Sequence, residues 1–401
     1  MATLACLRRD LDFMPSPVEE QPGLLIRDSF QFSDAVLIIP PQLVPYLAFF
    51  DGEKSVLDLK EALVRASGDF RAGEVADQMA AALGSSGFLE DEIFENMREA
   101  KVSEFGASDV REAAHAGSGY PEDVNELAQV MGHWLGEFGE EVPGLRAIAA
   151  PHVSPMGGYE SYRAAYGLLG DTYKEKTFVV LGTSHYGQPE KFGLTRKSYV
   201  TPWGAARTDT GLVAELTSKA GAAVETEDYC HAVEHSIEFQ VVYLQSIFGP
   251  DVKILPILCG SYAKSIYDTG MPEDDEGVRR FLGTLGEIGA REGDKLMWVL
   301  GIDMAHRGRR YHEAFDAIAD EGLMRSVATR DQQRIDRAAA GDAQGFWDLV
   351  RENHDDLNWC GSSPMYTFLK AMPGLKGKLE KYEQWNIDPA SVVSFAGMTF
   401  R

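Results

Sequence analysis

The amino-acid sequence predicts an α/β protein whose largely parallel sheet is covered by helices on both faces, preceded by a small winged-helix-like α+β domain. Short, continuously apolar segments alternate with amphipathic helices through most of the chain, a pattern typical of buried parallel sheets. The 401 residues exceed one ordinary domain, and a hydrophobic content of 44% is enough for a large core. We therefore expect a first domain over residues 1–98, a charged linker over 99–110 and an α/β domain over 111–401.

The small first domain is predicted from a strand, three helices and a closing strand. Residues 35–39 (Ala-Val-Leu-Ile-Ile) form the strand, and the proline pair that follows opens a helix over 41–50. Ser55 is suited to cap a second helix. A third helix is expected around 75–83, and residues 88–89 close the domain. This order of elements is typical of a winged helix.

The second domain begins with an amphipathic helix over about 122–137, followed by strands that alternate with helices. Continuous apolar runs predict strands at 145–150, 177–181, 253–258 and 296–302. Residues 391–400 are expected as a last strand, at an edge or antiparallel.

The composition indicates which binding partners and which cellular compartment to expect. A formal net charge of -24 argues against nucleic-acid binding, which depends on basic residues that neutralise phosphates. No segment contains eighteen consecutive apolar residues, so no membrane span is predicted. The N-terminus also lacks the pattern of a signal peptide. The four cysteines are too scattered for a disulfide framework. We expect a cytoplasmic protein without nucleic-acid or membrane partners.

Three histidines each follow the carboxyl end of a predicted strand: His152, His185 and His306. Because ligands of open α/β sheets bind at the carboxyl ends of the strands, these loops should converge on one crevice. Each histidine alone is equally explained as a hydrogen-bonded loop residue. Together they favour a mononuclear metal site, for which two imidazoles and one anionic ligand are a common donor set.

The third ligand must come from elsewhere in the chain. Cys360 is a candidate, with a buried structural thiol as the alternative. A thiolate would favour iron, copper or zinc over magnesium or calcium. His235 and Glu238 are expected as pocket or second-layer groups, with a helix cap as the alternative. A serine-hydrolase elbow at Ser184 is disfavoured, since Tyr186 stands where that motif needs a small residue.

Several short motifs occur in order along residues 110–401. They are Arg111-Glu-Ala-Ala-His115, Ala-Ala-Pro-His152, Leu-Gly-Thr-Ser-His185, Thr201-Pro-Trp-Gly204, Glu234-His235-Ser-Ile-Glu238, Asp303-Met-Ala-His306 and Cys360-Gly361. With these motifs the sequence resembles the Memo family, whose prokaryotic form is called AmmeMemoRadiSam system protein B. That family resembles class III extradiol dioxygenases in fold, so the resemblance implies a dioxygenase-like domain.

The resemblance implies that His152, His185 and Cys360 hold a metal ion, with iron or copper favoured and zinc as a third option. It implies that His306 takes the place of the acid/base histidine, with Asp303 beside it to orient it. Tyr186, where eukaryotic members have a second histidine, departs from the family, as does the loop after His152. These departures leave the ligands in place and affect the wall that faces the substrate.

The first domain resembles PqqD-type winged-helix domains, which recognise peptides and are associated with radical-SAM enzymes. The function implied is a metal-dependent oxidoreductase that acts on a small-molecule or peptide substrate with a radical-SAM partner. A non-catalytic metal- or peptide-binding scaffold on the same fold is the alternative. In a third alternative, the protein holds no metal in vivo, and the site binds an anionic or peptide ligand.

Overall fold

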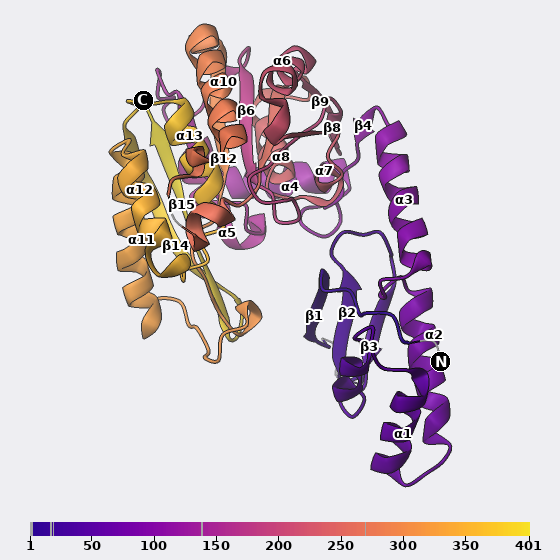
Figure 1. The fold of residues 1–401 in the computed structure, drawn as a ribbon. Helices are drawn as coiled ribbons and strands as arrows, with labels where there is room; N and C mark the ends of the chain where they lie inside the picture. Colours follow the sequence, from indigo (N-terminus) through magenta and orange to yellow (C-terminus); the bar gives the residue numbers. More distant parts are fainter. Residues whose placement is uncertain (1–2, 17, 19, 138, 269) are drawn as a thin grey trace. The chain divides into compact units, whose positions relative to one another are not determined.

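The computed structural model describes residues 3–16, 18, 20–137, 139–268 and 270–401. The chain divides into two compact units, Met1–Ala107 and Ser108–Arg401 (Figure 1). The division falls inside the segment 99–110 that was predicted as a linker, and residues 99–107 of that segment are helical, as the end of α3 (Glu92–Ala107). Phe94 and Phe105, eleven residues or about three helical turns apart, are both buried, which explains why this charged stretch stays helical.

The first unit contains a three-stranded antiparallel sheet in the order β1-β2-β3. Its elements are β1 (Leu11–Pro15), β2 (Leu24–Asp28), β3 (Val36–Ile39), the 3-10 helix η1 (Val44–Phe49), α1 (Val56–Ser67), α2 (Ala72–Ser85) and α3. Ser55 caps α1 as predicted, because its side chain accepts a hydrogen bond from the Asp58 amide in a capping box. Strands β1 and β2 were not predicted. The expected closing strand at Phe88-Leu89 is reduced to a single bridge between Leu89 and Leu7.

The second unit is built on a twelve-stranded sheet with the order β13-β15-β5-β12-β6-β11-β9-β8-β4, where β14 pairs with β15, and β7 joins β10 and β11. Strands β5, β12, β6 and β11 form its parallel centre. The strands are β4 (Val110–Arg111), β5 (Ala147–Ala150), β6 (Thr177–Thr183), β7 (Phe192–Leu194), β8 (Ser198–Thr201), β9 (Gly204–Thr208), β10 (Val224–Thr226), β11 (Lys253–Cys259), β12 (Leu296–Gly301), β13 (His306–Gly308), β14 (Gly377–Asp388) and β15 (Ser391–Phe400).

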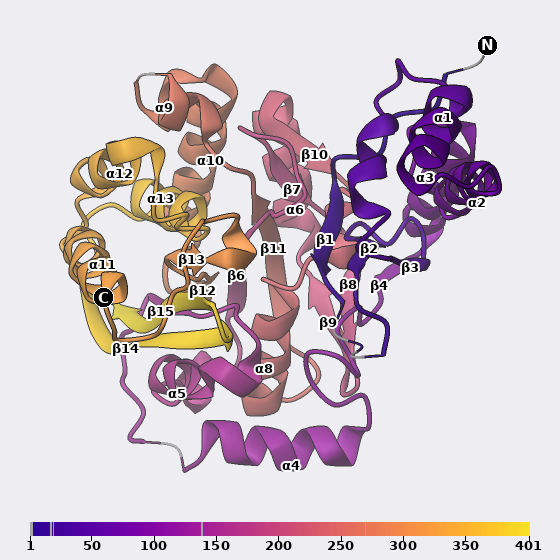
Figure 2. The same ribbon diagram turned by 90° about the horizontal axis from the view of Figure 1, so that it is seen from below.

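Helices cover both faces of this sheet, as predicted. They are α4 (Val124–Leu135), α5 (Pro155–Tyr166), α6 (Thr210–Ala220), α7 (Cys230–Val233), α8 (Glu238–Phe248), α9 (Ala263–Tyr267), α10 (Glu276–Glu292), α11 (Leu323–Ala339), α12 (Ala343–Arg351) and α13 (Ser362–Ala371). Short 3-10 segments are η2 (Asp171–Tyr173), η3 (Gly221–Ala223), η4 (Pro272–Asp274), η5 (Gly293–Lys295), η6 (Arg309–Tyr311) and η7 (Glu352–His354). Figure 2 shows α4, α5 and α8 on one side of the sheet and α10, α12 and α13 on the other.

Two hydrophobic cores lie on the two faces of the sheet, and β12 shows how one strand serves both. Leu296, Trp298 and Leu300 belong to the core that includes α10 and α13. The alternate residues Met297 and Val299 belong to the core that includes α4 and α8. Because side chains alternate across a strand, a strand buried on both faces must be apolar throughout. This is why the apolar runs identified the central strands.

Strand β15 was expected at an edge or antiparallel. It is antiparallel to β5, yet it lies inside the sheet, because β14 pairs with its other side along the whole strand, while β13 pairs with residues 391–393 on the same side as β5. All ten of its residues are buried. Among the described residues, no helix combines the length and the apolar composition that crossing a membrane requires.

Candidate metal centre

The candidate site lies at the carboxyl ends of adjacent parallel strands. His152 follows β5, His185 follows β6 and Asp303 follows β12, and β12 pairs with both β5 and β6. His235 comes from the segment between α7 and α8, and Cys360 directly precedes the start of α13. The sheet therefore brings together residues that are separated by up to 208 positions, as expected for an open α/β sheet.

The rings of His152, His185 and His235 form a close group. One ring nitrogen from each lies within 4.8 Å of the others. Ring centroids are 5.0 Å apart for His152 and His185, 5.2 Å for His152 and His235, and 5.0 Å for His185 and His235. His235 was expected only as a pocket residue, and it joins this group. Three imidazole nitrogens at this spacing can hold a transition metal ion.

Two of the three imidazoles have a defined tautomer. His152 donates from Nδ1 to the carbonyl oxygen of Gly301 at 2.9 Å, and His185 donates from Nδ1 to the Glu234 carboxylate at 3.0 Å. Because these partners only accept hydrogen bonds, each Nδ1 must carry a proton, and in the neutral ring the lone pair is then on Nε2. Metal-binding histidines are typically oriented in this way by a carboxylate or a carbonyl.

Glu234 organises the group from beneath. Its buried carboxylate accepts hydrogen bonds from the backbone amides of His185, His235 and Ser236 at 2.9, 2.8 and 3.0 Å. Nδ1 of His235 lies 3.2 Å away. Burial acts to raise the pKa of Glu234, but His185 and His235 outweigh it and the pKa lies well below its ordinary value. Glu234 was not predicted as a functional residue; its only signal in the sequence is its place directly before His235.

The protonation of the histidines differs across the group. Burial, followed by the neighbouring imidazoles, lowers the pKa of His152 well below its ordinary value. For His185 burial also acts to lower the pKa, but the charge and hydrogen bond of Glu234 outweigh it and raise the pKa. Burial therefore favours the neutral, metal-binding form of His152, whereas Glu234 favours the protonated form of His185, from which a metal ion would have to displace the Nε2 proton.

Cys360 lies against His152. Its Sγ is 3.3 Å from Nε2 of His152 and 3.7 Å from the carbonyl oxygen of Asp303. Burial raises the pKa of the Cys360 thiol, so the thiol keeps its proton until a cation replaces it. Imidazole nitrogens with one nearby sulfur make a donor set that suits iron, copper or zinc better than magnesium or calcium, so these residues fit such an ion.

Asp303 and His306 are close enough for the Asp303 charge to act on the pKa of His306, but no hydrogen bond joins them among the described residues. Oδ1 of Asp303 accepts from the amides of His152 and Val153 at 2.9 and 3.1 Å, so it holds the His152 loop. Nδ1 of His306 donates instead to the carbonyl oxygens of Met304 and Asn358, at 2.9 and 3.1 Å. Burial lowers the pKa of His306 to about 4, which leaves the ring neutral with Nε2 as a weak base.

Glu238, expected as a pocket group, lies in a buried network behind the site. It forms an ion pair with Arg111 and accepts hydrogen bonds from Tyr120 and from the His115 amide. Arg111 also donates to the carbonyl oxygens of His231 and Glu234 at 2.7 and 2.8 Å. The network thus holds the segment that carries Glu234 and leads to His235.

His231 lies apart from the candidate site. It could have shared a helix face with His235, but α7 ends at Val233, before His235. Nδ1 of His231 instead forms a 2.6 Å hydrogen bond with the hydroxyl of Tyr199.

A cavity of about 260 Å³ adjoins His185 and Cys360. Its wall also includes Ser184 and the aromatic residues Tyr262, Trp347 and Trp359. The Ser184 hydroxyl is buried and has no hydrogen-bond partner among the described residues. The ring of Tyr186 lies 6.3 Å from that of His185, and neither Tyr186 nor His306 is among the residues that line this cavity.

Comparisons with known proteins agree with this architecture. The family model described as "Memo-like protein" matches residues 111–399. A MEMO1 family protein from Aquifex aeolicus is 25% identical over 386 residues, covering 94% of this chain and 95% of its own length. Another from Thermococcus kodakarensis is 30% identical over 305 residues, covering 73% of this chain and 99% of its own. One from Pyrococcus furiosus is 31% identical over 255 residues, covering 61% and 82%.

Proposed function

The chain belongs to the Memo-like protein family, and on that premise we propose that it binds one iron or copper ion, with zinc as a third option, and acts as a dioxygenase-like oxidoreductase. The observation that carries the proposal is the group of three imidazoles, whose ring nitrogens lie within 4.8 Å of one another. Hydrogen bonds to Glu234 and Gly301 leave Nε2 of His185 and His152 free to coordinate.

The ligand set has two versions that share His152 and His185. Cys360 completes the set implied by the family resemblance, and its 3.3 Å approach to Nε2 of His152 supports that version. His235 completes the all-imidazole set, and its place in the close group supports the other. Both versions suit a soft or borderline transition metal.

A bound iron or copper ion would supply redox chemistry and open coordination positions for substrate and O₂. The residues of the chain would do the rest. Glu234 holds the Nδ1 proton of His185 and so keeps the ring oriented. His306 is neutral and can accept a proton at Nε2. The cavity beside His185 and Cys360 provides room for a small substrate.

Metal content is the first test. The wild-type protein and the variants His185→Ala, His235→Ala and Cys360→Ser would be purified without oxygen and analysed by mass spectrometry, with His133→Ala in helix α4 as a matched control. We expect near-stoichiometric iron or copper in the wild type and in the control, and loss in His185→Ala. Which of the other two variants loses the metal decides the third ligand. No metal in the wild type, and no uptake of added iron, copper or zinc, would contradict the proposal.

The alternative is a non-catalytic scaffold that reuses the fold. A cavity of about 260 Å³ next to two candidate ligands favours the enzyme, since a scaffold has no need of space there. Oxygen uptake by the metal-loaded protein during a substrate screen, absent from His185→Ala, would support the enzyme. If the metal is present and no substrate in the screen supports uptake, the scaffold is the better account.

We also propose that the first unit is a PqqD-like winged-helix domain that binds a peptide and links the protein to a radical-SAM partner. Within the part of the chain that the structure describes, β1 pairs with β2 alone, which leaves its outer edge for strand addition. A cavity of about 660 Å³ lies beside β1, lined in part by Phe13, Leu47 and Phe50. Affinity purification from the native cell should enrich a radical-SAM enzyme with the wild type and not with Phe13→Asp. Equal recovery, or none with either, would contradict this role.

A further inference from the structure

The candidate sulfur ligand is placed by a different part of the chain from the imidazoles. His152 and His185 each follow a strand of the parallel centre, whereas Cys360 lies in the segment 352–361 between α12 and α13. Its Sγ is nevertheless 3.3 Å from Nε2 of His152. Because this segment does not belong to the sheet, strand pairing cannot hold the thiol there, and other contacts must do so.

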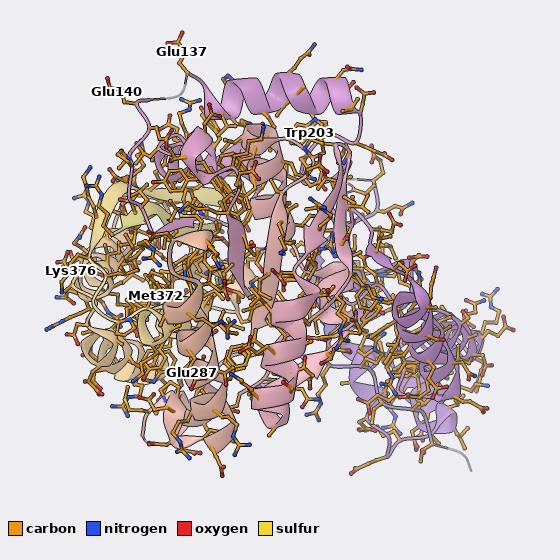
Figure 3. All side chains as sticks on the ribbon, turned by 90° about the horizontal axis from the view of Figure 1, so that it is seen from above. Glu137, Glu140, Trp203, Glu287, Met372 and Lys376 are labelled. Atoms are coloured by element: carbon orange, nitrogen blue, oxygen red, sulfur yellow. The ribbon has the colours of Figure 1, made fainter. Side chains whose placement is uncertain are left out.

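Helix α13, which begins two residues after Cys360, fixes the chain on one side of the thiol. Nine of its ten residues are buried, so the helix cannot shift without moving the core. Figure 3 shows Met372, directly after this helix, next to α10, which carries Glu287. At the near end, a Cβ on Gly361 would lie 2.6 Å from the Asp303 carbonyl oxygen, so only glycine allows this approach. What remains to be held is the chain before Cys360.

The chain before Cys360 has an unfavourable backbone conformation. Four of its residues have a φ of 52–55°: Asn353, His354, Asp355 and Asn358. They are four of the nine non-glycine residues with a positive φ in the described part of the chain, so the conformation is concentrated here. Residues with a side chain rarely adopt this left-handed region, although asparagine and aspartate tolerate it best. Such strain persists only where surrounding contacts enforce it, and it is typical of functional sites.

Helix α11 supplies such contacts through two buried charged residues, and the first is Arg334. Its Nη1 donates to Oδ1 of Asp355 at 2.7 Å, and its Nη2 donates to the Leu349 carbonyl oxygen at 2.9 Å. Oδ2 of Asp355 in turn accepts from the Trp359 amide at 3.1 Å. Arg334 therefore holds a strained residue and, through it, the backbone directly before Cys360.

The second buried residue of α11 is Asp331, which holds the ring of Trp359. Its fully buried carboxylate accepts from Nε1 of Trp359 at 2.8 Å, and also from the hydroxyls of Tyr382 and Ser394 at 2.8 and 2.6 Å. Oγ of Ser394 accepts from the Ala305 amide at 2.9 Å, in the segment that follows β12. Because removing a carboxylate from water is costly, this residue is better explained by the geometry it enforces than by stability.

We propose that Asp331 and Arg334 are positioning residues, which together form an α11 clamp that holds the segment 352–361 and places the Cys360 thiol against His152. With the clamp in place, sulfur and imidazole belong to one donor set. Without it, the three imidazoles keep their own hydrogen bonds and the sulfur moves away. The role of the sulfur rests on the proposed metal centre, but the position of the thiol can be measured without a metal ion.

Alkylation of the metal-free protein by iodoacetamide, in the presence of a chelator, tests the α11 clamp. The rate at each cysteine would be followed by mass spectrometry in the wild type, Trp359→Phe and Asp331→Asn. We expect Cys360 to react at least about tenfold faster in both variants, the effect of losing one hydrogen bond to a charged group. The buried thiols of Cys230 and Cys259 should stay unreactive, which distinguishes local release from unfolding.

The matched control is Asp336→Asn, the same substitution at an exposed position of α11 that contacts Gln332 instead of Trp359. It should leave the reactivity of Cys360 unchanged. Unchanged reactivity of Cys360 in the folded Trp359→Phe and Asp331→Asn variants would overturn the proposal. Equal acceleration at Cys360 and at the two buried thiols would also overturn it, since the whole fold would then have loosened.

Cobalt(II) separates the α11 clamp from the metal centre itself. A cobalt–thiolate bond gives a charge-transfer band in the near ultraviolet, which cobalt–imidazole bonds do not give. We expect this band in the wild type and in Asp336→Asn, and a weaker band or none in Trp359→Phe, although cobalt stays bound. No band in the wild type with cobalt bound, or equal bands in wild type and Trp359→Phe, would overturn the role of the clamp in the donor set. No cobalt binding, with the alkylation contrast intact, would contradict the metal centre and leave the clamp supported.

Discussion

The two ends of the central parallel sheet hold their charged groups differently. At the carboxyl ends, Glu234 accepts hydrogen bonds from three backbone amides and from the His185 ring, and Arg111 donates to Glu238 and to three carbonyl oxygens. At the amino ends, Arg146 donates to the Gly293 carbonyl oxygen and pairs with Asp294, a side chain that is 88% exposed. A buried charged network holds donor atoms in one geometry, as an ion requires. An arginine whose charged partner is exposed is held less firmly.

Replacing Arg111 and Arg146 in turn should give the largest difference in stability between the two ends of the sheet. Arg111→Met leaves Glu238 buried without its counter-charge, and we expect a loss of about 3–5 kcal/mol in the free energy of unfolding. Arg146→Met removes one exposed ion pair and should cost about 1 kcal/mol or less. All six tryptophans lie within Ser108–Arg401, so tryptophan fluorescence during urea titration reports this unit alone. Equal losses would show that the two environments do not differ as described.

Replacing Glu234 should lower metal affinity, whereas replacing Glu273, a carboxylate outside the histidine group, should not. Glu234→Gln removes the charge that orients His185, and we expect zinc affinity to fall by about 10–100-fold. Glu273→Gln, whose carboxylate pairs with Lys370 and Tyr366 and with none of the three histidines, should leave zinc affinity unchanged. Competition with a chromophoric chelator measures both. An unchanged affinity in Glu234→Gln, with the fold intact, would contradict the role assigned to Glu234.

The pH dependence of stability should also differ between the ends. Burial acts to raise the pKa of Glu238, but Arg111 outweighs it and the pKa falls below its ordinary value of 4.5. Because the folded-state pKa is the lower one, the carboxylate stabilises the fold fully above about pH 4.5 and loses this contribution as the pH falls. The stability difference between wild type and Glu238→Gln should therefore shrink from pH 7 to pH 4. For the less buried Glu273, the stability difference between wild type and Glu273→Gln should change less over the same pH range. A stability difference for Glu238→Gln that grows as the pH falls would contradict the expected direction.

Two glycine-to-alanine changes, at Gly283 and at Gly182, should give the smallest effects on stability, and these effects should have opposite signs. Gly283→Ala should stabilise the protein by up to about 1 kcal/mol, because helix α10 has room for the methyl group. Gly182→Ala, near the metal centre, should destabilise it, because the new Cβ would lie 2.5 Å from Oγ of Ser236 and 2.7 Å from Cγ1 of Ile237. Urea denaturation of both variants measures this contrast. Destabilisation by Gly283→Ala would mean that Gly283 has less free space around it than described.

The central strands were predictable because each is apolar on both faces, as Leu296 to Leu300 show. Strands β1 and β2 were missed, since β1 alternates buried with more exposed positions over only five residues. Helix α3 was taken for a linker because its sequence is charged, although Phe94 and Phe105 bury one side of it. Local sequence therefore identified strands that are apolar throughout and helices with regular apolar spacing, and missed a short alternating strand and a largely charged helix.

The sequence by itself determined the family, the parallel centre of the sheet, and the placement of His152 and His185 at strand ends, because strand periodicity and motif order are local properties. Only the tertiary structure decided that His235 joins these two, that Glu234 orients His185, and that Asp303 supports the His152 loop instead of His306. Arg111 and Glu238 meet across 127 positions. Such partners are selected by the free-energy cost of leaving a buried charge or donor unpaired, a cost that exists only once the chain has folded around them.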